Sequence, residues 1–156
     1  MRTKWFPTMF LGLMVLVLGV SPALAGDSLY GKVTEVKSAQ VVVFDYGRGH
    51  YDIRIVGIDV PQEGTVAREA RQFVSNLVLG KKVRMRFEQR TANGEMVSRL
   101  FTDDPAIGIK DVGLELLKAG LARKQPKYDY KYGELSAAEA EAQKAGRGLW
   151  AATRQK

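Results

Sequence analysis

The order of strand-like and helix-like segments constrains the fold of this chain more than any other feature. Residues 29–56 are rich in Val and Ile, which favour β-strands. The apolar pattern breaks twice, at residues 37–39 and across the glycine-rich residues 46–50. Such short breaks are typical of turns between neighbouring antiparallel strands. The segment therefore predicts three consecutive strands joined by two turns.

One helix interrupts the run of strands before it resumes. Residues 66–79 carry apolar side chains at helical spacing, and Gly80 follows as a stop signal. Residues 82–87 and 96–101 then alternate in strand fashion around the pair Asn93-Gly94. Because Asn-Gly is the strongest short hairpin signal, these residues predict a fourth and a fifth strand.

Two more helices are predicted after the fifth strand. Residues 111–119 have helical spacing and end before Gly120, and residues 134–145 are rich in Ala and Glu. The element order predicts an α+β fold, a five-stranded Greek-key β-barrel decorated by three helices, of which the OB-fold is the best-known case. A chain of 156 residues has room for one ordinary core, so we assign residues 26–156 to a single domain.

The first 25 residues have the pattern of an export signal. A short basic start precedes an apolar run at residues 9–20, and Ala23-Leu24-Ala25 supplies the small residues of a cleavage site. The run is shorter than the roughly 20 residues that span a bilayer. We therefore expect cleavage after Ala25, no stable membrane anchor afterwards, and a periplasmic or secreted protein.

Composition excludes some chemistry and favours one class of partner. The chain has no cysteine and a single histidine, His50, which excludes disulfides, cysteine nucleophiles and the usual zinc sites. Without the two basic residues of the leader, the charge of +7 falls to +5. A basic balance of this size favours weak attraction to polyanions.

Three short patterns carry a family resemblance. Residues 53–62 form a strand that runs into the turn Asp-Val-Pro-Gln, and Gly-Leu-Ala at 120–122 precedes Gly-Leu-Trp at 148–150. With these residues the chain resembles the thermonuclease (staphylococcal nuclease-like) family, whose turn reads Asp-Thr-Pro-Glu. The resemblance covers nearly all of residues 28–151 and implies the same OB-fold.

The resemblance also implies a site for phosphodiester cleavage. Family members use Ca²⁺, a carboxylate that activates water, and two arginines that hold the phosphate. These groups suit the chemistry, because a hard cation prefers oxygen ligands and the negative charge of the transition state needs cations beside it. By resemblance, Arg54 is the first arginine and Asp59 is one of the metal-binding carboxylates.

Three other family positions are replaced in this chain. Ala39 stands where the family has its second metal carboxylate. Gln62 stands where the family has its general-base glutamate, and an amide cannot take a proton at neutral pH. Glu95 aligns with the second arginine, which reverses the charge there, although a shifted hairpin register would offer Arg90 or Arg99 instead.

Basic and aromatic residues alternate in the segment after Ala122. We take Lys124, Lys127, Tyr128 and Tyr130 as candidate ligand-binding residues, because this alternation suits single-stranded nucleic acid on an OB-type surface. The resemblance implies that tyrosines of this segment line a nucleotide pocket. The alternative is that the tyrosines pack against the last helix while the lysines are merely solvated.

Three interpretations of function follow. The leading one is an exported, monomeric, catalytically degenerate domain without a cofactor that binds single-stranded nucleic acid or another polyanion. The enzyme alternative is an active Ca²⁺-dependent nuclease that cleaves DNA or RNA with rearranged carboxylates such as Asp45, Asp52 and Glu88. The third is a structural envelope protein without affinity for polyanions.

Overall fold

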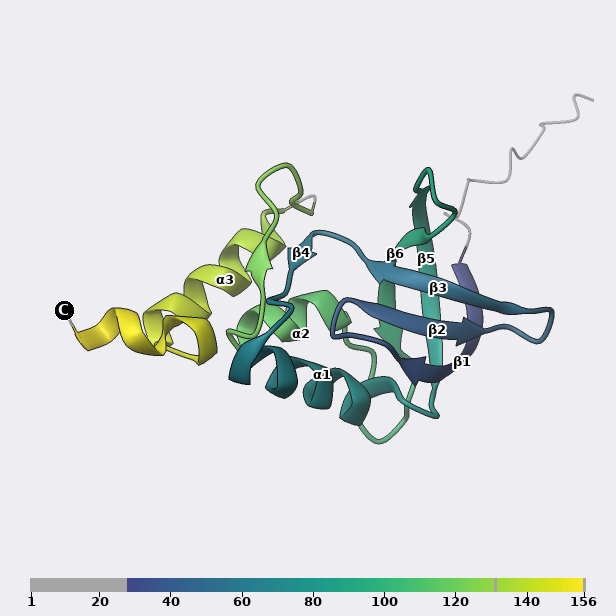
Figure 1. The fold of residues 1–156 in the computed structure, drawn as a ribbon, viewed down its shortest axis with the longest axis horizontal. Helices are drawn as coiled ribbons and strands as arrows, with labels where there is room; N and C mark the ends of the chain where they lie inside the picture. The colour runs from purple at the N-terminus through teal and green to yellow at the C-terminus, as the bar shows by residue number, and fades with distance from the viewer. Residues whose placement is uncertain (1–27, 131, 156) are drawn as a thin grey trace, which may run out of the picture.

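Five strands close into a barrel in the computed structural model, which describes residues 28–130 and 132–155. The predicted leader, residues 1–25, lies outside the described residues. The strand order around the barrel is β1-β2-β3-β6-β5, and Figure 1 shows the barrel on one side of the molecule with the helices on the other. The predicted α+β barrel with three helices is confirmed. The barrel strands are β1 (Ser28–Val36), β2 (Val41–Asp45), β3 (His50–Ile55), β5 (Lys82–Arg90) and β6 (Met96–Thr102).

One parallel pair closes the barrel among otherwise antiparallel neighbours. β3 pairs with β6 in parallel, with Ile53 opposite Met96 and Arg54 opposite Val97. A parallel pair needs a long crossover, and here the crossover contains a helix and β5. Register shifts at Val33/Glu35 in β1 and Phe87/Gln89 in β5 add the bends that a small barrel requires.

Three α-helices pack beside the barrel, as predicted from their apolar spacing. They are α1 (Gly64–Val78), α2 (Val112–Lys118) and α3 (Glu134–Ala145), followed by the 3₁₀-helix η1 (Gly148–Gln155). The buried face of α1 is formed by Ala70, Val74 and Val78. The core runs without interruption from barrel residues such as Phe44 to Leu135 of α3. In the part of the chain that is described, no helix is long and apolar enough to cross a membrane.

A second, two-stranded sheet was not predicted from the sequence. β4 (Ile58–Asp59) pairs with β7 (Arg123–Lys124), so the turn after β3 lies against the segment that follows α2. Gly57 precedes β4 with a positive φ of 82°, and a Cβ there would lie 2.7 Å from Leu135 Cδ1. Glycine is therefore required for the chain to pass this close to α3.

One buried ion pair joins the barrel to the helices. Asp111 caps α2 by accepting hydrogen bonds from the N–H groups of Gly113 and Leu114. Its other oxygen accepts from Arg99 Nε at 2.8 Å, and the Arg99 guanidinium lies 3.6 Å from the centre of the Tyr130 ring. Burial raises the pKa of the Asp111 carboxyl, and Arg99 and the two backbone donors oppose that rise.

We predict that Asp111→Ala lowers the free energy of unfolding by about 3 kcal/mol or more. The substitution removes a helix cap and leaves the half-buried Arg99 without its buried partner, and breaking such pairs is costly. Urea unfolding followed by circular dichroism measures the loss. Lys118→Ala is the matched control, because it breaks only the exposed pair with Glu115, and we expect a change below about 0.5 kcal/mol. Equal losses in the two variants would contradict the prediction.

Candidate active site

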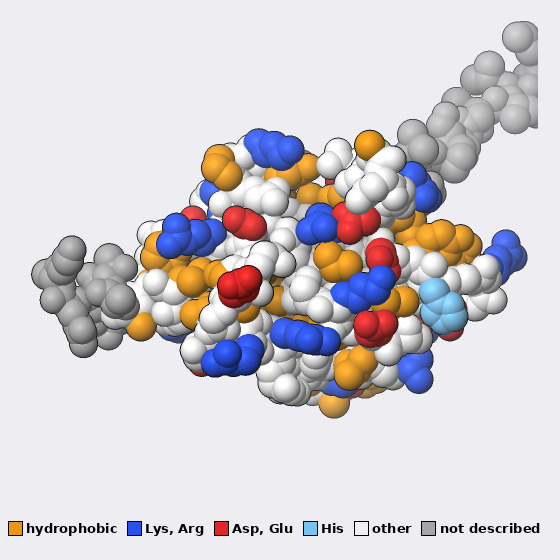
Figure 2. Space-filling model, viewed as in Figure 1, with side chains coloured by type: hydrophobic (Ala, Val, Ile, Leu, Met, Phe, Trp, Pro, Cys, Tyr) orange, Lys and Arg blue, Asp and Glu red, His pale blue; other side chains and the backbone are white. Residues whose placement is uncertain are grey.

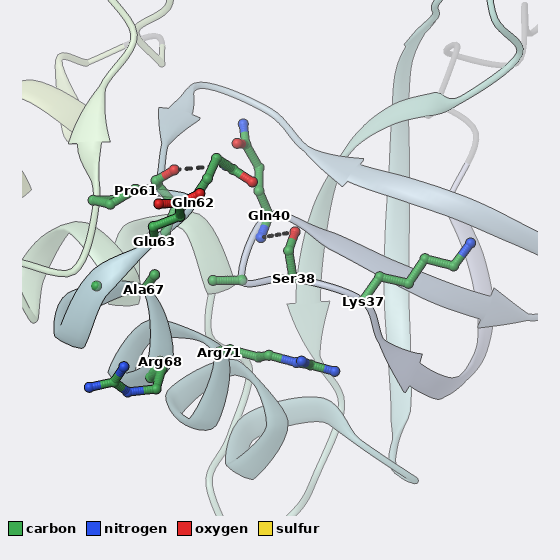
Figure 3. A pocket seen from close by; sticks show the side chains of 12 residues that line it. Lys37, Ser38, Gln40, Pro61, Gln62, Glu63, Ala67, Arg68 and Arg71 are labelled. Atoms are coloured by element: carbon green, nitrogen blue, oxygen red, sulfur yellow. Dashed lines mark hydrogen bonds between the residues drawn. The ribbon is translucent and has the colours of Figure 1, made fainter.

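The family's metal and base positions border one pocket. This pocket of about 330 Å³ lies between the β1–β2 turn and the start of α1, and Ala39, Val60 and Gln62 all contribute to it. Figure 3 shows that the charged ends of Lys37 and Arg71 point away from Gln62 rather than toward it. The centre of the pocket is therefore walled by a methyl group, an isopropyl group and amides.

Two amides occupy backbone carbonyls in this pocket. Gln40 donates through Nε2 to the carbonyl oxygen of Ile58 at 2.7 Å, and Gln62 donates through Nε2 to the carbonyl oxygen of Val60 at 2.9 Å. These two carbonyls flank Asp59 in the sequence. An oxygen that accepts from an amide N–H has less capacity left for a cation. Sequence reasoning missed Gln40, whose signal was a long polar side chain at the start of an apolar strand.

The residues present do not fit a calcium ion. Ala39 is only 3% exposed and offers no oxygen, while Asp59 is exposed and lines none of the pockets described here. Within residues 28–130 and 132–155, no three His, Cys, Asp or Glu side chains gather in an arrangement that could hold a metal. Calcium takes six to eight oxygen ligands, usually including several carboxylates. We therefore derive no catalytic step through a metal.

The carboxylates of the enzyme alternative are engaged elsewhere. Asp52 accepts from Lys37 Nζ at 2.7 and 2.8 Å, and Asp45 lies 3.7 Å from His50. Glu88 lies 3.6 Å from Arg86. Figure 2 shows acidic and basic side chains side by side over the β2–β3 surface. Each of these carboxylates thus faces a cation rather than another carboxylate.

Arg54 forms a two-pronged ion pair with Glu95. Arg54 Nε lies 2.9 Å from Glu95 Oε2, and Nη2 lies 3.0 Å from Oε1. The barrel topology explains the contact, because Arg54 is opposite Val97 and Glu95 lies two residues earlier, on the same face. This geometry matches the way a guanidinium binds phosphate. A carboxylate therefore lies where Arg54 would hold a phosphate oxygen.

A small second pocket surrounds Arg54. It encloses about 170 Å³, and its lining includes Gln40, Gln89, Lys127 and Tyr128. Gln89 Nε2 donates to the Tyr128 hydroxyl at 3.1 Å, and Lys127 Nζ lies 5.2 Å from the centre of the Tyr128 ring. Gln40 borders both this pocket and the larger one. We call this second pocket the Arg54 cleft.

The other two candidate ligand-binding residues are held by the protein itself. Lys124 Nζ donates to the carbonyl oxygen of Tyr128 at 3.3 Å. The Tyr130 hydroxyl is buried and has no hydrogen-bond partner among the described residues, and Arg99 covers one face of the ring. Burial raises the pKa of the Tyr130 hydroxyl well above its usual range. Tyr130 therefore packs inward, although its edge lines a third pocket of about 440 Å³ with Arg86 and Tyr132.

Comparison with known proteins places the chain in a nuclease family. A family model described as "Staphylococcal nuclease homologue" matches residues 52–152. A protein of Verticillium alfalfae named "Probable endonuclease LCL3" is 34% identical over 110 residues, which cover 63% of this chain and 38% of the relative. Proteins of the same name from Pyricularia oryzae and Neosartorya fischeri are 32% and 35% identical over 115 and 110 residues, covering 64% and 63% of this chain and 43% and 36% of those relatives.

The chain thus spans about two fifths of the length of these relatives. The family match begins within β3, so Ala39 lies before the matched segment, whereas Arg54, Asp59, Gln62 and Glu95 lie inside it. The barrel topology, the turn after β3 and the Gly-Leu-Trp segment at 148–150 agree with this match. The chain is a member of the staphylococcal nuclease family.

Proposed function

We propose that this protein binds single-stranded nucleic acid in the Arg54 cleft and has lost efficient phosphodiester hydrolysis. The observation that carries the proposal is the division of the family site. Arg54, Lys127 and Tyr128 still surround one cleft, whereas Ala39 and Gln62 leave the neighbouring pocket without a carboxylate for a metal or a base. Ligand-holding groups have stayed, and reacting groups have gone.

Hydrolysis requires a group that accepts a proton from water. Gln62 is an amide, and its nitrogen already donates to the Val60 carbonyl. A positioned general base typically contributes about 10² to 10⁴ in rate. Losing that group alone would reduce turnover to a small fraction of that of an intact family member.

Binding requires cations for phosphate and flat surfaces for bases. Lys127 is exposed beside the half-buried ring of Tyr128, and Arg54 stands behind them. Because Arg54 already holds Glu95, a phosphate must compete with a carboxylate for the guanidinium. We therefore expect affinity to be modest and sensitive to salt.

The rest of the proposal concerns the setting of the protein. We propose that residues 1–25 direct export, that the domain acts as a monomer in the periplasm or outside the cell, and that it needs no cofactor. The competing function is a Ca²⁺-dependent nuclease, which is favoured by the printed name of the relatives, "Probable endonuclease LCL3". In that case calcium would be the cofactor.

Calcium binding tests the metal position directly. We predict a dissociation constant weaker than about 10⁻⁵ M, because Asp59 is the one carboxylate left at this position. Isothermal titration calorimetry on the purified protein measures it, with Asp59→Asn as the matched variant. Tighter binding that disappears in Asp59→Asn would show that the ligands lie elsewhere and would promote the nuclease alternative.

Substitution of Tyr128 tests the cleft. We predict that Tyr128→Ala weakens binding of a short oligo-dT by about tenfold or more, because stacking contributes roughly 1 to 3 kcal/mol per base. Tyr128→Phe removes only the hydroxyl that accepts from Gln89 and should bind nearly as well as the wild type. Fluorescence anisotropy at low salt provides the measurement. Unchanged binding by Tyr128→Ala would remove the main support for the cleft.

Reversion of the replaced positions tests the loss of hydrolysis. We predict that Gln62→Glu alone and Glu95→Arg alone remain as slow as the wild type. The first has no metal to hold water, and the second places two arginines together without a nucleophile. The triple change Ala39→Asp, Gln62→Glu and Glu95→Arg is the version expected to recover activity.

The readout is cleavage of plasmid and single-stranded DNA with Ca²⁺, Mg²⁺, Mn²⁺ or EDTA. Removal of one phosphate-binding arginine has cost about 10³ to 10⁵ in other phosphoryl-transfer enzymes, so recovery would be plain in the assay. Metal-dependent cleavage by the wild type that is lost in Arg54→Gln would contradict the proposal.

A further inference from the structure

The outer surface of three neighbouring barrel strands carries aromatic and basic side chains in rows. The strand registers place Tyr30 of β1 opposite Arg84 of β5, and Arg84 opposite Phe101 of β6. The adjacent row places Lys32 opposite Lys82. We call these five residues the β1–β5–β6 face.

Alternation along the strands shows that these side chains point outward. Val83, Met85 and Leu100 are fully buried and point into the barrel. Their neighbours Arg84 and Phe101 must therefore point to the opposite side of the sheet. Tyr30, at 53% exposed, is one of the most exposed large side chains among the described residues.

Cations lie over the aromatic rings of this face. Lys82 Nζ is 5.4 Å from the centre of the Tyr30 ring, and the Arg84 guanidinium carbon is 4.6 Å from the centre of the Phe101 ring. Such contacts hold the cations near the sheet without neutralising them. The arrangement keeps positive charge and flat rings within one small area.

Carboxylates neutralise this face less than they neutralise the β2–β3 surface. No described carboxylate lies within ion-pair distance of Arg84 or Lys32, and Lys82 has only Asp103, at 3.7 Å. By contrast, the Lys37–Asp52 pair on the opposite part of the barrel is closed at 2.7 Å. Weak, exposed pairs such as Lys82–Asp103 exchange readily with other anions.

We propose that the β1–β5–β6 face is a second binding surface for single-stranded nucleic acid. Aromatic rings next to cations match a chain in which flat bases alternate with phosphates, and this combination is typical of sequence-independent binding. The face is separate from the Arg54 cleft, which is lined from β3, β5 and the segment around Tyr128. The inference goes beyond the proposed function, because the cleft could bind a strand without this face, and the reverse also holds.

Arg86 gives the face a direct connection to the tyrosine segment. It follows Arg84 on the same side of β5, and it also lines the third pocket with Tyr130 and Tyr132. Tyr132 is 77% exposed. A strand bound on the β1–β5–β6 face can therefore continue past Arg86 toward Tyr128, which borders both the third pocket and the Arg54 cleft.

The test compares oligo-dT binding by two double variants that lose the same charge. Lys82→Gln with Arg84→Gln alters the face and keeps much of each side-chain stem. Arg48→Gln with Lys118→Gln is the control, because both residues are exposed and lie outside the face. For the face variant, we expect the slope of log K against log salt to fall by about 1.4, since each lost phosphate contact on a single strand removes about 0.7.

The control variant should keep the wild-type slope within experimental error. Tyr30→Ala should weaken binding by about tenfold without changing the slope, because it removes stacking and no charge. Circular dichroism and urea unfolding of every variant confirm that the barrel is intact. A face variant that behaves like the control, or a wild type that binds no oligo-dT at low salt, would overturn the inference.

Arg54→Gln separates this inference from the proposed function. If the face variant keeps wild-type affinity while Arg54→Gln loses it, the cleft stands and the face falls. If the face variant loses affinity and Arg54→Gln does not, the face stands alone. An acidic peptide such as oligo-Glu serves as a competing probe, and tighter binding of this peptide than of oligo-dT would also overturn the inference.

Discussion

The contact between Arg99 and Asp111 is the interaction on which the arrangement of the two halves depends. It is a buried charge pair at the point where β6, α2 and the tyrosine segment meet. Asp111 needs the guanidinium as well as the N–H groups of α2, because an ionised carboxylate without partners is costly to bury. Tyr130 covers the guanidinium from the other side, which fixes the path of the chain between β7 and α3. The position of Tyr128 beside Arg54 follows from that path.

A second guanidinium organises the candidate site in a similar way. Arg54 is bound through two hydrogen bonds, but its partner Glu95 comes from a hairpin rather than from a helix. Both members of this pair are partly exposed, so the pair is easier to open than the one at Arg99. One arginine is thus built into the structure, whereas the other remains within reach of a ligand.

Strongly patterned segments of the sequence predicted the fold well. The Val-rich runs, Asn93-Gly94 and the glycines after the helices predicted five strands and three helices, and the structure confirms them. The β4–β7 pair was missed because two-residue strands carry no periodic signal. The Arg54–Glu95 pair depends on the parallel β3–β6 register, which joins residues far apart in the sequence. The roles of the Gln40 and Gln62 amides depend on carbonyl positions that no residue type reveals.

The replacements at Ala39 and Glu95 are physically linked. A phosphate held between two arginines and a calcium ion satisfies all three cations, and removing the metal carboxylates removes one of them. With the metal gone and no phosphate bound, a second arginine at position 95 would face Arg54 in a partly buried cleft, and like charges at such distances repel. Glutamate at position 95 converts that repulsion into an ion pair. The substitution that most opposes catalysis is therefore also the one that best stabilises the cleft without its metal, and such trade-offs between activity and stability are common at former active sites.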